Sequence, residues 1–191
     1  MLLLKRDGFF QRPSNRPILV SQWVAEAIRQ NRATLPFASF FRPDTILVPT
    51  PKSSLMQPGT LWVPHRLATA LTQCGLGKQV AEMLGRVKPV PKAAWSRPEN
   101  RPLPQQHYDS MEVQKVLSEP GNILLVDDIL TRGATLLGAA SRLAEAFPRA
   151  EIRAFAAMRA ISTENKFEQV YSPVIGTISL REAQGDTLRI P

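Results

Sequence analysis

The chain has 191 residues, of which 43% are hydrophobic and 21% charged, and these values exclude an intrinsically disordered protein. Its single cysteine, Cys74, excludes an internal disulfide and a cysteine-based zinc pair, which fits a reducing compartment. The 24 Lys and Arg residues against 16 Asp and Glu give a formal net charge of +8, which favours polyanionic partners. The alternative is a solubilising excess of charge spread over the surface.

The length predicts one domain over residues 1–191, since two full domains would be cramped. The apolar start, Met1 to Leu4, is followed at once by charged residues and is too short for a signal sequence or a membrane span. We therefore expect a cytoplasmic protein with no membrane partner.

Helical and strand patterns alternate in the first half of the chain. A helix is predicted over 21–30, where Ser21 can act as the N-cap. A buried strand is predicted over 46–48, because prolines stop a short apolar run there. Two more helices are predicted, over 64–75 and 78–84.

The segment 87–109 contains five prolines and is predicted to be a flexible loop. Basic residues gather around it, and they are Arg86, Lys88, Lys92, Arg97 and Arg101. The loop is either a solvated surface segment or a lid that closes over pyrophosphate. Trp95 is the one tryptophan among these basic residues, and His107, near the end of the loop, is interpreted as a surface residue.

The second half begins with a strand predicted over 122–126 that opens directly onto Asp127 and Asp128. A helix with an apolar stripe from Leu136 to Ala144 follows, and the next strand is predicted over 152–158. Strand, helix and strand in this order predict a βαβ unit, and therefore an α/β protein with a parallel sheet flanked by helices.

The segment from Ile123 to Thr135 places two acids at a strand end and a small-residue turn at a helix start. Ligands of open α/β sheets bind at the carboxyl ends of strands, and helix N-termini offer amide donors to phosphate. Gly133 allows close backbone approach, while Thr131 and Thr135 add hydroxyl donors. An acidic strand end that caps a helix is the alternative interpretation.

These thirteen residues resemble the phosphoribosyl-pyrophosphate signature of type I phosphoribosyltransferases, which is four apolar residues, two acids and a Thr-x-Gly-x-Thr turn. The resemblance implies the fold of that family, a parallel sheet flanked by helices with a small hood. It also implies that Asp127 and Asp128, the candidate catalytic residues, contact ribose hydroxyls and hold Mg²⁺ indirectly or through the ligand. The 5-phosphate of 5-phosphoribosyl 1-pyrophosphate (PRPP) would bind the turn residues Thr131, Arg132, Gly133, Ala134 and Thr135.

The whole chain also resembles the competence-protein-F (ComF) group, through Leu4-Lys5, Val48-Pro49-Thr50-Pro51 and Ser96-Arg97. In that group the Val-Pro-x-Pro segment is the pyrophosphate loop, which makes Thr50, Pro51 and Lys52 candidate PRPP contacts. The Cys-rich zinc segment of the group is absent from this sequence. Thr60 to Val63 replaces its Arg-Gly-Phe-Asn stretch, so the acceptor cannot be assigned by analogy.

Purine salvage enzymes of the wider family carry an acidic general base at the position of Thr131. A threonine cannot take a proton from a purine nitrogen at neutral pH, which argues against hypoxanthine-guanine salvage. The sequence thus predicts a PRPP-binding phosphoribosyltransferase that uses Mg²⁺, releases pyrophosphate and transfers its group to a nitrogen nucleophile or nucleobase. The alternative is a catalytically silent PRPP sensor, or a nucleic-acid-associated accessory protein of the competence or defence type. A nucleic-acid partner and a homodimer stay open.

Overall fold

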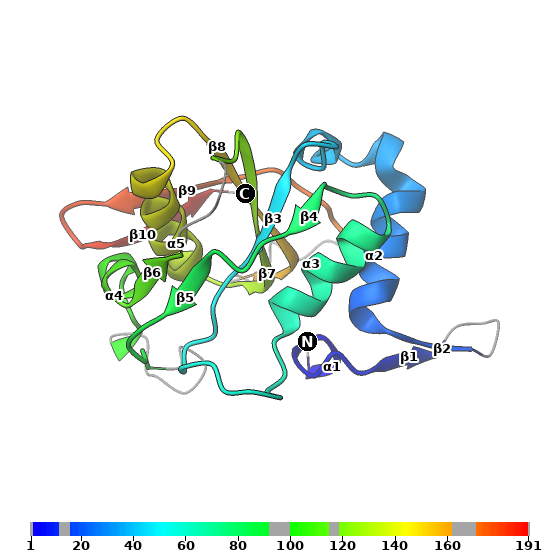
Figure 1. The fold of residues 1–191 in the computed structure, drawn as a ribbon, viewed down its shortest axis with the longest axis horizontal. Coiled ribbons are helices and arrows are strands. Elements are labelled where there is room, and N and C mark those ends of the chain that lie inside the picture. Colours follow the sequence, from blue (N-terminus) through cyan, green and yellow to red (C-terminus); the bar gives the residue numbers. More distant parts are fainter. Residues whose placement is uncertain (1, 12–15, 92–99, 115–118, 162–170, 191) are drawn as a thin grey trace.

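The computed structural model describes residues 2–11, 16–91, 100–114, 119–161 and 171–190. Its centre is a four-stranded sheet with the strand order β4-β3-β7-β8 (Figure 1). All neighbouring strands of this sheet run parallel. The predicted α/β class, a parallel sheet flanked by helices, is confirmed.

The elements before the central βαβ unit are α1 (Leu2–Lys5), β1 (Phe9–Gln11), β2 (Pro17–Leu19), α2 (Val20–Asn31), the 3₁₀ turns η1 (Arg32–Thr34) and η2 (Ala38–Phe40), β3 (Ile46–Pro49), α3 (Val63–Gln73), β4 (Gln79–Val80), β5 (Leu84–Arg86), α4 (Pro104–Asp109) and β6 (Met111–Val113). The unit itself and the C-terminal elements are β7 (Asn122–Leu130), α5 (Ala134–Ala146), β8 (Glu151–Arg159), β9 (Thr177–Arg181) and β10 (Asp186–Ile190). Among the described residues, no helix is long and apolar enough to cross a membrane.

The hydrophobic core lies on both faces of the central sheet, because the side chains of β7 alternate between them. Leu124 and Val126 pack with α2 and α3 on one face. Ile123 and Leu125 pack with α5 on the other face. Figure 1 shows α2 and α3 on one side of the sheet and α5 on the opposite side. The four apolar residues of β7 are buried on both sides, which explains their unbroken apolar run.

Two helices predicted in the first half of the chain are confirmed, with shifts at their ends. The helix predicted over 21–30 is α2, but it begins at Val20, and Ser21 is not its N-cap. Instead the Ser21 amide donates a 2.8 Å hydrogen bond to the Asp7 carboxylate, so the first turn is capped from a distant part of the chain. The helix predicted over 64–75 is α3, which ends before Gly75 with its positive φ of 73°.

The helix predicted over 78–84 is wrong, because the segment forms the edge strand β4 and continues to β5. The backbone amides of Lys78 and Ala81 donate to the carbonyls of Thr45 and Leu47, at 2.7 and 2.9 Å. Pairing with β3 satisfies these amides and fixes an extended backbone there.

The prediction of a loop over 87–109 is wrong at its end, where α4 forms. Pro104 stands in the first turn of α4, where a helix needs no amide donor and the fixed φ of proline suits the helical backbone. The side chain of Gln106 accepts a 2.8 Å hydrogen bond from the Leu103 amide and helps to cap this helix.

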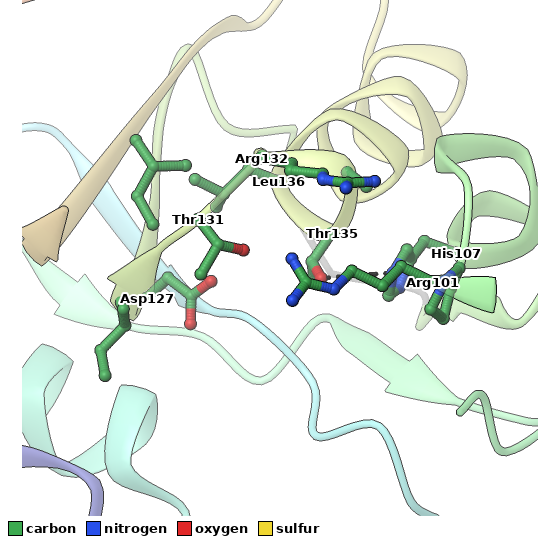
Figure 2. A pocket seen from close by; sticks show the side chains of 12 residues that line it. Arg101, His107, Asp127, Thr131, Arg132, Thr135 and Leu136 are labelled. Carbon is green, nitrogen blue, oxygen red and sulfur yellow. Dashed lines mark hydrogen bonds between the residues drawn. The ribbon is translucent and has the colours of Figure 1, made fainter. Parts of the chain in front are cut away.

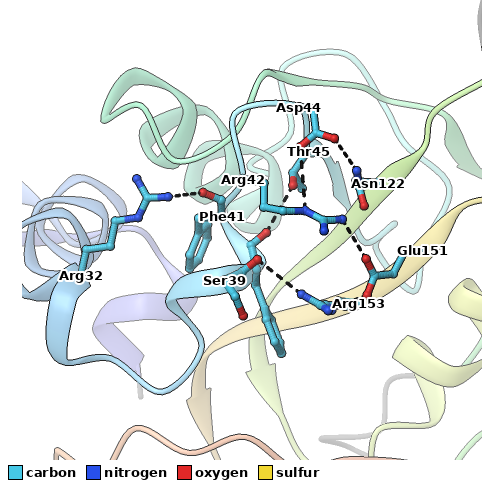
Figure 3. Close-up of polar contacts among 10 residues, drawn as sticks. Arg32, Ser39, Phe41, Arg42, Asp44, Thr45, Asn122, Glu151 and Arg153 are labelled. Atoms are coloured by element: carbon cyan, nitrogen blue, oxygen red, sulfur yellow. Dashed lines mark hydrogen bonds and ion pairs between the residues drawn. The ribbon is translucent and has the colours of Figure 1, made fainter.

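A polar cluster holds the amino ends of the central strands, at the end of the sheet opposite to the two acids (Figure 3). Arg42 forms a 2.7 Å ion pair with Glu151 at the start of β8, and Asn122 at the start of β7 donates to Asp44. Arg153 contacts Glu151 as well and donates to the Ser39 carbonyl. These contacts join the starts of β7 and β8 to the segment before β3, and the carboxyl ends of the strands lie at the opposite end of the sheet.

Candidate functional site

Strand β7 extends four residues beyond its neighbour β3, and this overhang creates the candidate site. Pairing with β3 ends at Val126, opposite Pro49, whereas pairing with β8 continues to Leu130. The predicted strand end at residue 126 is therefore wrong. Asp127 and Asp128 lie within β7, on a stretch whose β3-facing edge has no strand partner in the described sheet. Ligands of open parallel sheets bind at the carboxyl ends of the strands, where these residues lie.

Asp127 and Asp128 are successive residues of β7, and their side chains interact with each other. Asp127 lines a crevice together with the start of α5, and its side chain points into it (Figure 2). Burial, the neighbouring Asp128 charge and the Asp128 side chain raise the pKa of Asp127 to about 7, and a hydrogen bond from Thr50 offsets part of this rise. Each carboxylate accepts a hydrogen bond from the amide that follows it, at 2.9 Å for Asp127 and 2.8 Å for Asp128.

The turn Thr131–Thr135 forms the opposite wall of the same crevice. Gly133 is the N-cap of α5 and has a φ of +91°, a conformation that glycine adopts without strain. No side chain caps the amides of the first turn of α5. These amides, the helix dipole and the two threonine hydroxyls can therefore bind an anion.

The loop after β3 is joined to the end of β7. The Thr50 amide donates a 2.9 Å hydrogen bond to the Val126 carbonyl, one residue before the acids. The Trp62 indole donates to the Thr50 carbonyl at 2.8 Å, and its ring stacks on His65. The structure thus places Thr50 and Pro51, both buried, and the half-buried Lys52 beside the strand that carries Asp127.

A buried polar chain connects this loop to the turn, and the sequence did not predict it. Arg86 is 7% exposed and His107 6% exposed, so the predicted surface position of His107 is wrong. Arg86 donates to the Lys52 carbonyl at 2.9 Å, to the Ser110 hydroxyl, and to Nδ1 of His107 at 3.5 Å. Nε2 of His107 lies 3.4 Å from the Thr135 hydroxyl.

The tautomer of His107 follows from these contacts. A guanidinium group has only donors, so Nδ1 of His107 must be the acceptor, and Nε2 carries the proton toward Thr135. Burial and the Arg86 charge lower the pKa of His107 to about 4, while burial lowers the pKa of Arg86 only to about 10. At neutral pH the pair is therefore a charged arginine and a neutral histidine.

The C-terminal hairpin β9–β10 supports the turn from outside the sheet and was also not predicted. The Thr187 hydroxyl donates to the Arg132 carbonyl at 2.8 Å. Arg189 donates to the carbonyls of Leu130 and Ala160, at 3.3 and 2.6 Å. A Cβ atom at Gly133 would lie 2.8 Å from Ile178 of the same hairpin. A signal for the hairpin exists in the sequence, since Gly185 separates two short segments with β-branched residues.

Of the basic residues grouped around the proline-rich segment, the three that the structure describes lie in different surroundings. Arg86 is buried in β5, and Lys88 is exposed. Arg101 reaches into the crevice beside the turn (Figure 2). Lys92, Trp95, Ser96 and Arg97 lie outside the described residues, so the predicted lid stays a prediction.

Residues that could hold a metal ion are few in the described part of the chain. No group of three or more His, Cys, Asp and Glu residues comes together there. His65 pairs with the Glu82 carboxylate at 2.9 Å, away from the acids of β7. Asp127 and Asp128 are adjacent carboxylates, and carboxylate oxygens suit Mg²⁺, which is usually held by one or two carboxylates together with substrate phosphates. The two residues therefore fit a Mg²⁺ ion that shares its coordination with a phosphorylated ligand.

Comparisons with known proteins give likenesses among solved structures alone. No family model matches the sequence, and no curated protein matches it. Among solved structures, the chain is similar to adenine phosphoribosyltransferase from Saccharomyces cerevisiae, in a complex with D-2,5-dideoxy-2,5-imino-altritol 1,6-bisphosphate and adenine. The sequence identity is 21%, the TM-score is 0.36, and the likeness covers 83% of this chain and 89% of that chain. At this TM-score the likeness says nothing of what this chain binds or transfers.

Proposed function

We propose that this chain binds PRPP with Mg²⁺ at the carboxyl end of β7 and transfers the phosphoribosyl group to a nitrogen nucleophile, with release of pyrophosphate. One observation carries the proposal. The overhang of β7 brings an acid pair, a helix N-terminus without a side-chain cap and the loop after β3 to one edge of the sheet. An anion-binding turn next to carboxylates suits a phosphorylated sugar, because the turn accepts phosphate and carboxylates accept hydrogen bonds from hydroxyl groups.

The parts of the ligand would be distributed along this edge. The 5-phosphate would bind the amides and hydroxyls of Thr131–Thr135, and the ribose hydroxyls would donate to Asp127 and Asp128. Pyrophosphate would contact Thr50, Pro51 and Lys52, where the Lys52 ammonium balances its charge. Asp127 and Asp128 would hold Mg²⁺ together with ligand oxygens, and the ion would neutralise charge on the pyrophosphate.

The reaction itself needs little from the protein beyond positioning. A nitrogen lone pair forms the new bond to ribose C1, and the electron pair of the broken C1–O bond leaves with pyrophosphate. The nitrogen then loses its proton to solvent. Fixed donors around the leaving group stabilise the charge that develops on it, which accounts for a site without a cysteine nucleophile.

The test is calorimetric titration of PRPP with and without Mg²⁺, combined with a pyrophosphate release assay across ammonia, amines and nucleobases. Asp127→Asn with Asp128→Asn should abolish PRPP binding while the protein stays folded. Asp44→Asn is the matched control, because it removes an acid at the opposite edge of the sheet. A wild-type protein that does not bind PRPP contradicts the proposal.

A silent PRPP sensor is the second candidate. The observation that favours it is Thr131, which stands on the crevice wall and cannot act as a general base. A sensor would bind PRPP in the titration yet release pyrophosphate with none of the acceptors.

A further inference from the structure

Arg101 carries a buried hydrogen-bond donor without a partner. Its Nε atom is inaccessible to solvent and forms no hydrogen bond with the described residues. The side chain forms no ion pair within the described part of the chain either, although it lines the same crevice as Asp127. A buried donor without an acceptor is costly and uncommon, and the described residues supply no acceptor for this one.

The position of Arg101 is fixed by its neighbours. Pro102 is buried and lines the crevice, and α4 begins two residues later. Helix α4 packs closely on α5 at Gly138, where an added Cβ would lie 2.6 Å from the Pro104 carbonyl oxygen. The backbone next to Arg101 is therefore held against the helix whose first turn forms the other wall of the crevice.

The side chain of Arg101 lies inside the crevice that the turn lines. Figure 2 shows the guanidinium group of Arg101 inside the crevice, pointing toward Asp127 from the side of His107 and Thr135. The crevice wall includes the whole turn Thr131–Thr135, whereas Thr50, Pro51 and Lys52 are not part of it. An anion on the turn lies within this crevice, and an anion on the loop after β3 does not.

We propose that Arg101 is a direct ligand of the phosphate monoester that binds the turn Thr131–Thr135. This inference rests on the proposed function, since that monoester is the 5-phosphate of PRPP. The guanidinium fork matches two phosphate oxygens. Arg101 thus adds a positive charge to a turn that otherwise offers amides and hydroxyls, and its role differs from that of a lid over pyrophosphate.

Ribose 5-phosphate and pyrophosphate are the probes that separate these roles. Calorimetry would compare both in the wild type, Arg101→Gln, Arg101→Lys and Arg149→Gln. The last variant is the matched control: it removes the same charge at the far end of α5, where the side chain is 84% exposed. Urea unfolding of each variant shows that it is folded, and Arg101→Lys keeps the charge while it loses the fork.

Arg101→Gln should weaken ribose 5-phosphate binding about tenfold to hundredfold, the effect of losing charge-assisted hydrogen bonds. Arg101→Lys should recover part of this loss, and pyrophosphate binding should stay unchanged in both variants. Unchanged ribose 5-phosphate binding in Arg101→Gln overturns the inference, and so does an equal loss for pyrophosphate or an equal loss in Arg149→Gln. A wild-type protein that binds neither ribose 5-phosphate nor PRPP instead overturns the proposed function as well.

Discussion

Protonation of His107 should destabilise the protein, and this provides a test of the buried chain beneath the site. The pKa of His107 is about 4 in the folded protein, against an ordinary value of 6.5. The unfolded chain therefore takes up this proton first as the pH falls. The stability that neutral His107 contributes is complete above pH 6.5 and is lost as the pH falls to about 4. At about 1.4 kcal/mol per pKa unit, the loss is about 3 kcal/mol.

The physical cause is the arrangement around the ring. A proton on Nδ1 would face the Arg86 guanidinium 3.5 Å away, in a site that is largely closed to solvent. Asp127 acts in the opposite direction. Its pKa is raised to about 7 in the folded protein, so protonation of Asp127 stabilises the folded state as the pH falls. The wild-type curve alone therefore does not isolate His107, and a difference between two proteins is needed.

The assay is urea unfolding of the wild type and His107→Gln between pH 7 and pH 4, followed by tryptophan fluorescence. His107→Gln loses packing at every pH, but it has no histidine to protonate at this position. The stability gap between the two proteins should shrink by about 3 kcal/mol as the pH falls. His65→Gln, which removes the other histidine, is the control. A gap of constant size for His107→Gln would refute the arrangement of His107 and Arg86.

Three further substitutions test how the crevice is built. Gly138→Ala should lower the free energy of unfolding by about 1–3 kcal/mol in urea titration, because the new methyl group overlaps the α4 backbone, whereas Gly121→Ala has open space and should have little effect. Gly133→Ala should destabilise the protein by about 1 kcal/mol or more, since φ is +91° and the new methyl group would overlap Ile178. It should also weaken ribose 5-phosphate binding in calorimetry, and unchanged affinity would contradict this geometry. Thr187→Val should leave Arg132 without its hydroxyl donor and weaken the same binding, and Ser179→Ala on the same hairpin is the control.

The central βαβ unit could be predicted because its signals are local. A buried parallel strand needs a continuous apolar run, and the turn of α5 needs a small residue, so β7 and Gly133 are visible in a short window of sequence. The end of β7 could not be predicted in the same way. It depends on β8, which continues to pair with residues 127–130 after β3 has stopped, and pairing with a distant strand leaves no local pattern.

The burial of Arg86 and His107 could not be predicted for a different reason. His107 and Arg86 have ordinary polar surroundings in the sequence. His107 is buried where α4 packs on Gly138 of α5, some thirty residues further along the chain, and Arg86 of β5 is buried beside it. Pro104 was a usable signal, since a proline in the first turn often begins a helix. Five prolines in one segment concealed it, because a proline anywhere else breaks a helix.

The role of the buried Arg86 follows from the two parts of the site that it connects. Burying a guanidinium costs desolvation free energy, and an apolar side chain of similar size would often be as stable in its place. Arg86, however, contacts the Lys52 carbonyl on one side and His107 on the other, and His107 reaches Thr135. Lys52 belongs to the loop after β3, and Thr135 belongs to the turn of α5. Without the polar chain, only the backbone of β7 would connect this loop to this turn. An apolar residue would fill the space without fixing the distance between the loop and the turn. The polar chain therefore contributes geometry to the candidate site in a way that packing alone cannot.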